Sequence, residues 1–176
     1  LEVGDAIIVT GTIGDHGLAV IGARNALGLE GDLRSDVAPL NGLVRAALAA
    51  GGTALHAMKD PTRGGVTSAL VEMAAKAGVA IVLEEAALPM SAPGRAAAEL
   101  LGIDPLTVAN EGKALIGVHP SARGRVLAAL HAHPLGRAAA CIGRVLDGEK
   151  GSLRLDTGFG TRLLFERDGD PLPRIC

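Results

Sequence analysis

Short runs of β-branched and apolar residues alternate along this chain with longer segments of helical periodicity, and this alternation restricts its fold more than any other feature. Strands are expected at residues 5–10, 53–58, 79–83, 113–118, 138–145, 153–155 and 162–165. Helices are expected at residues 18–27, 36–48, 66–76, 93–101 and 121–131, with Asp36 and Ser121 as caps of the second and last. The sequence therefore predicts an α/β (α+β) fold, a mixed sheet with helices mainly on one face.

Composition limits the function classes. The 176 residues are 48% hydrophobic with a mean hydropathy of +0.35, which indicates one globular domain. A net charge of −2, two Phe and no Trp or Tyr offer neither a basic field nor a stacking surface, so we expect no nucleic acid partner. Every apolar run is shorter than the roughly 20 residues of a membrane span, so no membrane partner is expected either.

The cysteines, the first residue and the histidines each add an expectation. Cys141 and Cys176 make no disulfide framework, which suits a reducing cytoplasm. Leu1 in place of methionine indicates that the sequence begins inside a larger protein. No zinc or iron site is expected, because four of the five histidines lack partners at ligand spacing. They are His56, His119, His131 and His133.

The chain ends on Cys176, at the tip of a segment that cannot continue a regular element. Pro171 and Pro173 remove backbone donors and fix φ, which favours an extended arm. We predict a folded domain over residues 1–166 and a flexible tail over residues 167–176 that carries a reactive thiol. A frayed terminus whose cysteine has no function is the alternative that the tail alone leaves open.

A compact motif has the composition of an anion-binding turn. Its residues are Asp60, Pro61, Thr62, Arg63, Gly64 and Gly65. Free N–H groups at a helix start can face an anion, a threonine can donate to phosphate, and an aspartate can coordinate a metal ion or position a substrate. Two adjacent glycines let another backbone or a ligand approach closely. A helix cap with proline at its first position explains the first two residues equally well, but it leaves the arginine and glycines unexplained.

Two further loops combine glycine with ionisable side chains. Residues 11–17 hold three glycines with Asp15 and His16, where an imidazole could move protons near neutral pH. Glu111 lies in an Asn-Glu-Gly turn before a predicted strand, where a buried or charge-flanked carboxylate could act as a base. Taken singly, these loops are also typical of a capped helix start, a surface histidine and an ordinary turn.

Five segments together resemble one known family along nearly the whole chain. They are Gly11-Thr12-Ile13-Gly14-Asp15-His16-Gly17, Asp60-Pro61-Thr62-Arg63-Gly64-Gly65, Asn110-Glu111-Gly112-Lys113, Phe159-Gly160-Thr161-Arg162 and the ending Leu172-Pro173-Arg174-Ile175-Cys176. The sequence is similar to the HypE family of hydrogenase maturation proteins, in the aminoimidazole ribonucleotide synthetase superfamily. The resemblance covers the C-terminal domain of that family only, and nothing here corresponds to its N-terminal nucleotide-binding domain.

This resemblance implies a specific chemistry. The complete protein would accept a carbamoyl group on its terminal cysteine from a partner carbamoyltransferase and dehydrate it with ATP and magnesium to a thiocyanate. It would then deliver cyanide to the iron of a [NiFe]-hydrogenase precursor on an iron-carrying scaffold complex. Cys176 would be the carrier, positioned by Pro173, Arg174 and Ile175, and Glu111 the candidate base.

The resemblance also divides the work between this chain and the missing domain. The residues expected to face the nucleotide or the tail are Asp60, Thr62, Arg63, Gly64, Gly65, Asp15 and His16. Most nucleotide contacts and much of a homodimer interface would come from the missing domain, so the fragment alone would be inactive. Two other functions stay open: a ring-forming ATP-dependent synthetase of the same superfamily, which needs no terminal cysteine, and a non-catalytic docking domain.

Overall fold

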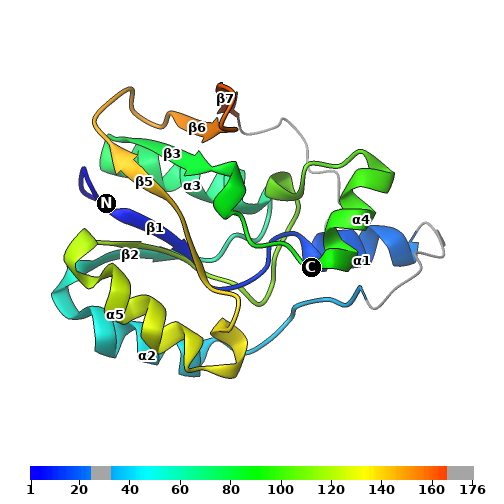
Figure 1. Ribbon diagram of the computed structural model, residues 1–176, viewed down its shortest axis with the longest axis horizontal. Coiled ribbons are helices and arrows are strands. Elements are labelled where there is room, and N and C mark those ends of the chain that lie inside the picture. The colour runs from blue at the N-terminus through cyan, green and yellow to red at the C-terminus, as the bar shows by residue number, and fades with distance from the viewer. Residues whose placement is uncertain (25–32, 166–176) are drawn as a thin grey trace.

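The computed structural model describes residues 1–24 and 33–165, which form one sheet of seven strands with five α-helices around it (Figure 1). The strands are β1 (Ala6–Val9), β2 (Leu55–Lys59), β3 (Ala80–Glu84), β4 (Leu115–Val118), β5 (Ala140–Leu146), β6 (Leu153–Asp156) and β7 (Thr161–Leu164). The helices are α1 (Asp15–Arg24), α2 (Asn41–Gly51), α3 (Gly65–Ala77), α4 (Ala92–Leu101) and α5 (Pro120–His131). Short 3₁₀ turns are η1 (Gly52–Ala54), η2 (Glu85–Ala87), η3 (Pro105–Thr107) and η4 (Pro134–Gly136).

The strand order is β2-β4-β1-β5-β3-β6-β7, so β1 lies between β4 and β5 in the interior of the sheet. Among the described strands, β3 and β6 pair parallel and every other neighbouring pair is antiparallel. The predicted α/β class and mixed sheet are therefore confirmed. The ladders place Val9 of β1 and Lys59 of β2 opposite the same residue, Leu115 of β4. The loops that leave β1 and β2 thus begin beside the loop that enters β4.

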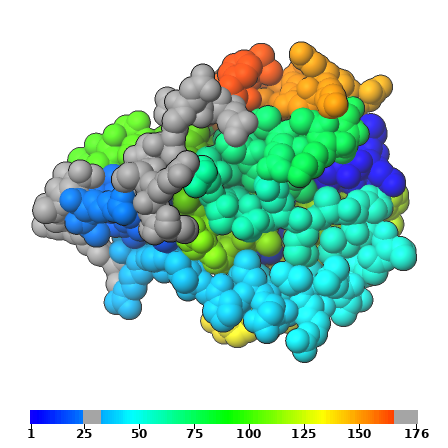
Figure 2. All heavy atoms as spheres, turned by 180° about the vertical axis from the view of Figure 1, so that it is seen from behind, coloured from blue at the N-terminus to red at the C-terminus, as the bar shows by residue number. Residues whose placement is uncertain are grey.

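Helices cover both faces of the sheet, and the expectation that they pack mainly on one face is wrong. Ile7 of β1 belongs to a core cluster that contains α3, whereas its neighbour Ile8 belongs to a cluster built from α2 and α5. Successive strand side chains point to opposite faces, so these clusters lie on opposite sides. Figure 1 accordingly shows α2 and α5 together below the sheet, away from α3, which Figure 2 shows on the surface seen from behind. The apolar run of β1 is consistent with a core on both faces, where polar alternation is lost. A run of this length does not by itself distinguish a strand covered on both faces from one covered on one face.

Two predicted helix caps are corrected. Asp36 does not begin a helix, since α2 starts at Asn41 after Leu40, which makes no side-chain cap. The carboxylate of Asp36 is instead paired with Lys113. At α5 the cap is His119, whose side chain accepts from the backbone N–H of Ser121. Helix α1 starts three residues earlier than predicted, and residues 25–27 of that prediction lie outside the described residues.

No helix within the two described ranges is both long and apolar enough to span a lipid bilayer.

Candidate functional site

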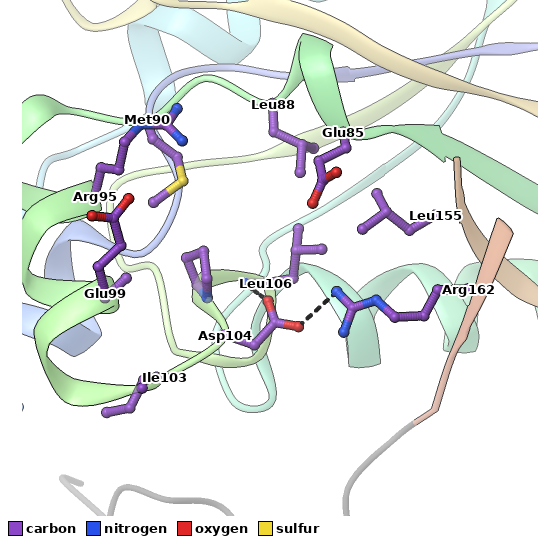
Figure 3. Close-up of a pocket in the computed structure, with 13 residues that line it drawn as sticks. Glu85, Leu88, Met90, Arg95, Glu99, Ile103, Asp104, Leu106, Leu155 and Arg162 are labelled. Carbon is purple, nitrogen blue, oxygen red and sulfur yellow. Dashed lines mark hydrogen bonds and ion pairs between the residues drawn. The ribbon is translucent and has the colours of Figure 1, made fainter. Parts of the chain in front are cut away.

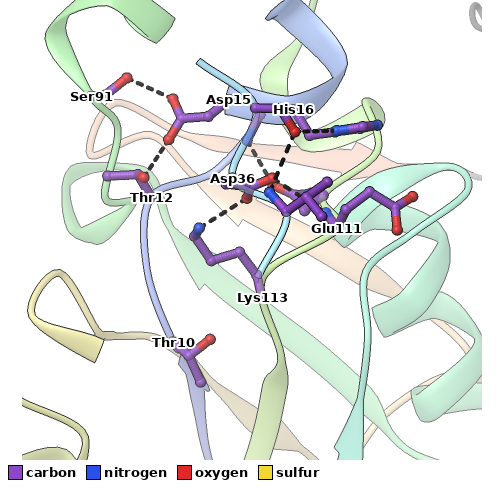
Figure 4. A network of polar contacts seen from close by, with 12 residues as sticks. Thr10, Thr12, Asp15, His16, Asp36, Ser91, Glu111 and Lys113 are labelled. Carbon is purple, nitrogen blue, oxygen red and sulfur yellow. Dashed lines mark hydrogen bonds and ion pairs between the residues drawn. The ribbon is translucent and has the colours of Figure 1, made fainter. Parts of the chain in front are cut away.

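Three of the sequence motifs meet at the end of the sheet where β1 and β2 stop and β4 begins (Figure 4). The segments at residues 11–17, 60–65 and 106–113 contribute to it, and residues 35–38 join them. Polar residues of these segments are among the most buried in the molecule: Asp15, His16, Asn110 and Lys113 are each at most 9% exposed. Thr10, directly before the first segment, is 1% exposed. Such burial requires nearly every group to have a partner, so the network defines the loop geometry.

Asn110 connects the three segments. Its side chain is 1% exposed, and its Oδ1 accepts a hydrogen bond of 2.8 Å from the backbone N–H of Gly14. Its Nδ2 donates to the carbonyl oxygens of Val108 at 3.1 Å and Pro61 at 3.3 Å, and its own N–H also donates to Pro61 at 3.1 Å. From the sequence, Asn110 is predicted only as part of a turn. An amide directly after the apolar pair Val108-Ala109 was the signal for a buried polar group.

The glycines of the 60–65 motif serve backbone packing. Gly65 has a φ of +63°, and a Cβ there would lie 2.5 Å from the carbonyl oxygen of Val108 and 2.6 Å from that of Leu106. Gly64, also left-handed at a φ of +69°, takes the N-cap position of α3 without a side-chain cap. Asp60 is exposed and does not cap the helix, so the helix-cap explanation of the motif is wrong.

Gly65→Ala is expected to destabilise the fold by about 3 kcal/mol, since a left-handed alanine costs about 1 kcal/mol and the overlap with two carbonyl oxygens adds about 2 kcal/mol. Gly102→Ala is the matched control. Its φ is +64°, but a Cβ there meets no described atom within 4 Å, so only the backbone cost of about 1 kcal/mol applies. Urea unfolding at an unchanged m-value measures both. Equal losses for the two variants would contradict the close-approach explanation.

Asp15 and His16 are buried at the start of α1, so the surface-histidine alternative is wrong. The Asp15 carboxylate accepts from Ser91 Oγ at 2.6 Å and from Thr12 Oγ1. His16 Nδ1 lies 2.8 Å from Ser35 Oγ, and its Nε2 is buried without a hydrogen-bond partner among the described residues. Both residues are buried, so their side chains hold the loops in place through these contacts.

Glu111 is exposed, so of the two settings considered for a base, buried or charge-flanked, the buried one does not apply. Its backbone N–H donates to Asp36 Oδ1 at 3.3 Å, and its side chain points away from Lys113 (Figure 4). The carboxylate therefore stands at the rim of the network on a backbone that the network holds. A group placed this way is accessible to a reactant from outside the domain.

Asp60 lies apart from the buried network, in a cavity of about 490 Å³ between β2 and α3. Lys59 and Lys76 both pair with Glu72 on the wall of this cavity, at 2.9 and 2.6 Å. Thr62 is half-buried and Arg63 is exposed. The structure thus attaches the 60–65 motif to the network through Pro61 while its charged side chains face outward.

The carboxyl group of Glu72 is expected to titrate at about 2. The hydrogen bond from Lys76, followed by that from Lys59, holds the pKa of Glu72 below its ordinary value of 4.5. Because the folded pKa is lowered, the stabilisation is fully present above pH 4.5 and is lost as the pH falls toward 2. An NMR titration measures the midpoint, which should rise in Lys76→Gln and stay in place in Arg123→Gln on the opposite face. An unshifted midpoint in Lys76→Gln would contradict this.

A second cavity, of about 410 Å³, lies between α4, η3 and the β6–β7 hairpin (Figure 3). Arg95 and Glu99 stand on one wall, and Arg162 stands on the other. Arg162 pairs with Asp104 at 3.1 Å. Arg162, the last residue of the Phe159–Arg162 segment of the family resemblance, therefore lines this cavity and does not join the buried network. Phe159 of that segment is fully exposed at the hairpin tip.

The remaining site predictions concern the tail and the metal. Cys176, Pro173, Arg174 and Ile175 lie outside the described residues. Within residues 1–24 and 33–165, no group of three His, Cys, Asp or Glu side chains could hold a metal ion. Asp60 has no second carboxylate beside it in its cavity wall except the Lys-paired Glu72. Among the described residues, Asp60 therefore has no free second carboxylate with which to hold a magnesium ion.

The mixed sheet and its loop network define the class of domain. The family described as AIR synthase related protein, C-terminal domain, matches residues 2–156, and the chain belongs to this family. Within it, the chain is similar to proteins named carbamoyl dehydratase HypE. The relative from Rhizobium leguminosarum bv. viciae is 47% identical over 98% of this chain and 50% of its own length. That from Escherichia coli K12 is 46% identical over 100% of this chain and 52% of its own length.

Solved structures agree with this assignment. E. coli HypE superimposes with a TM-score of 0.93 at 44% identity, covering 100% of this chain and 54% of that one. A HypE in complex with ATP gives 0.91 at 34% identity, over 97% of this chain and 52% of that one. The HypE-HypF complex gives 0.90 at 38%, over 95% and 54%. The chain thus spans about half the length of the relatives it matches and corresponds to their C-terminal domain.

Proposed function

We propose that this chain is the C-terminal domain of a carbamoyl dehydratase that serves [NiFe]-hydrogenase maturation. The observation that carries the proposal is the 47% identity, over 98% of the chain, to a protein named carbamoyl dehydratase HypE. In the complete protein, a carbamoyl group on Cys176 is dehydrated with ATP to a thiocyanate, whose cyanide is then donated to iron.

The chemistry explains why a thiol and a base are both needed. The amide oxygen of an S-carbamoyl group leaves poorly as hydroxide, so transfer of the γ-phosphoryl group of ATP to that oxygen makes phosphate the leaving group. One N–H proton leaves as the oxygen is phosphorylated, and a base removes the second as the C–O bond breaks and the C≡N bond forms. The products are the thiocyanate, ADP and phosphate. Cys176 supplies the sulfur and Glu111 is the proposed base.

The geometry supports these roles in different ways. Glu111 is exposed on a turn whose backbone N–H is bonded to Asp36, so a thiocarbamate on the tail that arrives from outside can reach it. Arg63 is exposed and Thr62 is half-buried at the start of α3, where they can meet nucleotide phosphates, and the exposed Asp60 can position a substrate. Asp15 and His16 support these loops from within, Gly65 lets the chain segments approach, and Gly64 supplies the left-handed N-cap of α3.

The cofactor and partners follow the same proposal. ATP, together with its Mg²⁺, is bound mainly by the N-terminal half that the relatives have in addition, and a HypE solved with ATP supports nucleotide binding. The HypE-HypF complex supports a carbamoyltransferase partner. An iron-carrying scaffold complex, a homodimer of the complete protein and a cytoplasmic location complete the proposal. For the present chain alone, we propose docking without turnover, since it spans half of its relatives.

An intact-mass measurement of the tail peptide tests this function. The complete protein is incubated with the carbamoyltransferase and carbamoyl phosphate, and ATP is added afterwards. The expected result is a carbamoyl adduct on the tail peptide that loses one water only after ATP is added. A tail peptide that never acquires the adduct would contradict the proposal and favour a ring-forming synthetase. An adduct that retains its water with ATP present would leave a docking function alone.

A further inference from the structure

A buried aspartate holds the turn that carries Glu111, and the proposed function does not yet use it. Asp36 has a side chain only 6% exposed, and its two oxygens serve different partners. Oδ1 accepts from the backbone N–H of Glu111 at 3.3 Å, and Oδ2 lies 2.9 Å from Lys113 Nζ, whose side chain is 11% exposed. One carboxylate therefore binds the residue proposed as base and the residue two positions later.

Backbone packing brings the same segments together. A Cβ at Gly112, between these two residues, would lie 1.7 Å from the carbonyl oxygen of Asp36 and 3.1 Å from the backbone nitrogen of Ala38. A Cβ at Gly11 would lie 2.6 Å from Cε of Lys113. Glycine at both positions allows the β1 loop, the Glu111 turn and residues 36–38 to lie in direct contact. The turn cannot move without displacing Asp36.

Residues 35–37 are fixed in turn to α1. Ser35 Oγ contacts Nδ1 of the buried His16 at 2.8 Å and accepts from the N–H of Val37 at 3.3 Å. The backbone of residues 35–37 joins these contacts to those of Asp36, and Figure 4 shows His16, Asp36 and Glu111 close together. The residues before and after Asp36, Ser35 and Val37, are thus held by hydrogen bonds. The Asp36 carboxylate therefore contacts the Glu111 turn from a fixed backbone.

We infer that Asp36, through its pair with Lys113, is a positioning residue that fixes the Glu111 carboxylate for the dehydration step. This inference rests on the proposed function of Glu111. Placement matters because a misplacement of about 1 Å can lower a rate roughly 100-fold. Removing one member of a buried ion pair also leaves the other charge unpaired, which displaces the local structure. Asparagine at position 36 can keep the acceptor for Glu111 N–H, but its NH₂ or neutral oxygen cannot neutralise Lys113.

The test measures the two half-reactions separately in the complete protein. Asp36→Asn and Lys113→Met are expected to accept the carbamoyl group on Cys176 as the wild type does, with an unchanged KM for ATP. Their single-turnover dehydration rate should fall about 10- to 100-fold. Lys113→Arg, which keeps the charge, should recover part of that rate. Hydrogen exchange at the Glu111 amide should accelerate in Asp36→Ala. In a Glu111→Gln background, adding Asp36→Asn should lower the rate by less than about threefold, because coupled residues are not additive.

Glu84→Gln is the matched control, because it removes one carboxylate from an exposed ion pair with Arg144 at 3.0 Å on the sheet. Its dehydration rate should equal that of the wild type. A wild-type rate in Asp36→Asn, a full additive loss in the Glu111→Gln background, or a loading defect that parallels the dehydration defect would each overturn the positioning role alone. Wild-type dehydration in Glu111→Gln by itself would instead overturn the proposed base, and with it this inference.

Discussion

Replacement of Cys176 by alanine in the complete protein is expected to abolish both the carbamoyl adduct and its dehydration product. The thiolate is the nucleophile that accepts the group, and no other atom of an alanine tail can replace it. Intact mass of the tail peptide after incubation with the carbamoyltransferase, carbamoyl phosphate and ATP measures both losses in one experiment. ATP binding should persist, because the tail thiol is proposed to carry the substrate and not to hold the nucleotide.

The chain offers its own control for this result. Cys141, the other cysteine in the sequence, lies half-buried in β5 with its Sγ 3.7 Å from the carbonyl oxygen of Gly143. Cys141→Ala should keep the adduct and the water loss. If Cys176→Ala still formed the nitrile product, or if Cys141→Ala lost it with the fold intact, the carrier role of the terminal cysteine would be wrong.

Glu111→Gln is expected to stop the reaction at the carbamoyl adduct. Glutamine matches glutamate in size, so the turn and the N–H contact to Asp36 should persist, but the amide cannot accept a proton at neutral pH. General base catalysis contributes about 10²- to 10⁴-fold, so the dehydration rate should fall by about that factor while loading of Cys176 is unchanged. Single-turnover dehydration of the preloaded protein, followed by intact mass, measures the rate.

Two further variants separate the base from its surroundings. Glu111→Asp keeps a carboxylate one methylene shorter and should retain part of the rate. Glu149→Gln removes an exposed carboxylate from the turn between β5 and β6 and should retain all of it. Dehydration at the wild-type rate in Glu111→Gln would exclude Glu111 as the base and direct attention to the buried groups beside it.

Local patterns predicted most of the fold. The apolar run at β1 and the one at β3 are strands close to the predicted bounds, and α3 ends at the predicted Gly78, which is left-handed with a φ of +73°. These elements depend on residues near in sequence, through propensity, periodicity and capping. The placement of the helices on the two faces of the sheet could not be predicted in this way, because a short apolar strand looks the same whether helices cover one face or both.

The candidate site shows the same division. Asp15, His16 and Glu111 stand out as ionisable residues beside glycine, and the structure places them around one network. Asn110 and Asp36 were missed or misassigned. Asn110 binds Gly14, 96 positions away, and Asp36 binds Glu111, 75 positions away. An asparagine in a turn and an aspartate before a helix have common local explanations, so nothing nearby distinguishes them.

Local sequence is sufficient to predict the strand and helix segments, the glycine-rich turns and the ionisable candidate residues, because each depends on neighbours within a few positions. It also determined the family resemblance, through motifs that keep their spacing. The tertiary structure alone decided that helices cover both faces, that Gly65 serves a backbone contact, and that Asp36 holds the Glu111 turn. These facts depend on which distant segments the sheet brings together, and buried polar groups take whatever partner that topology supplies.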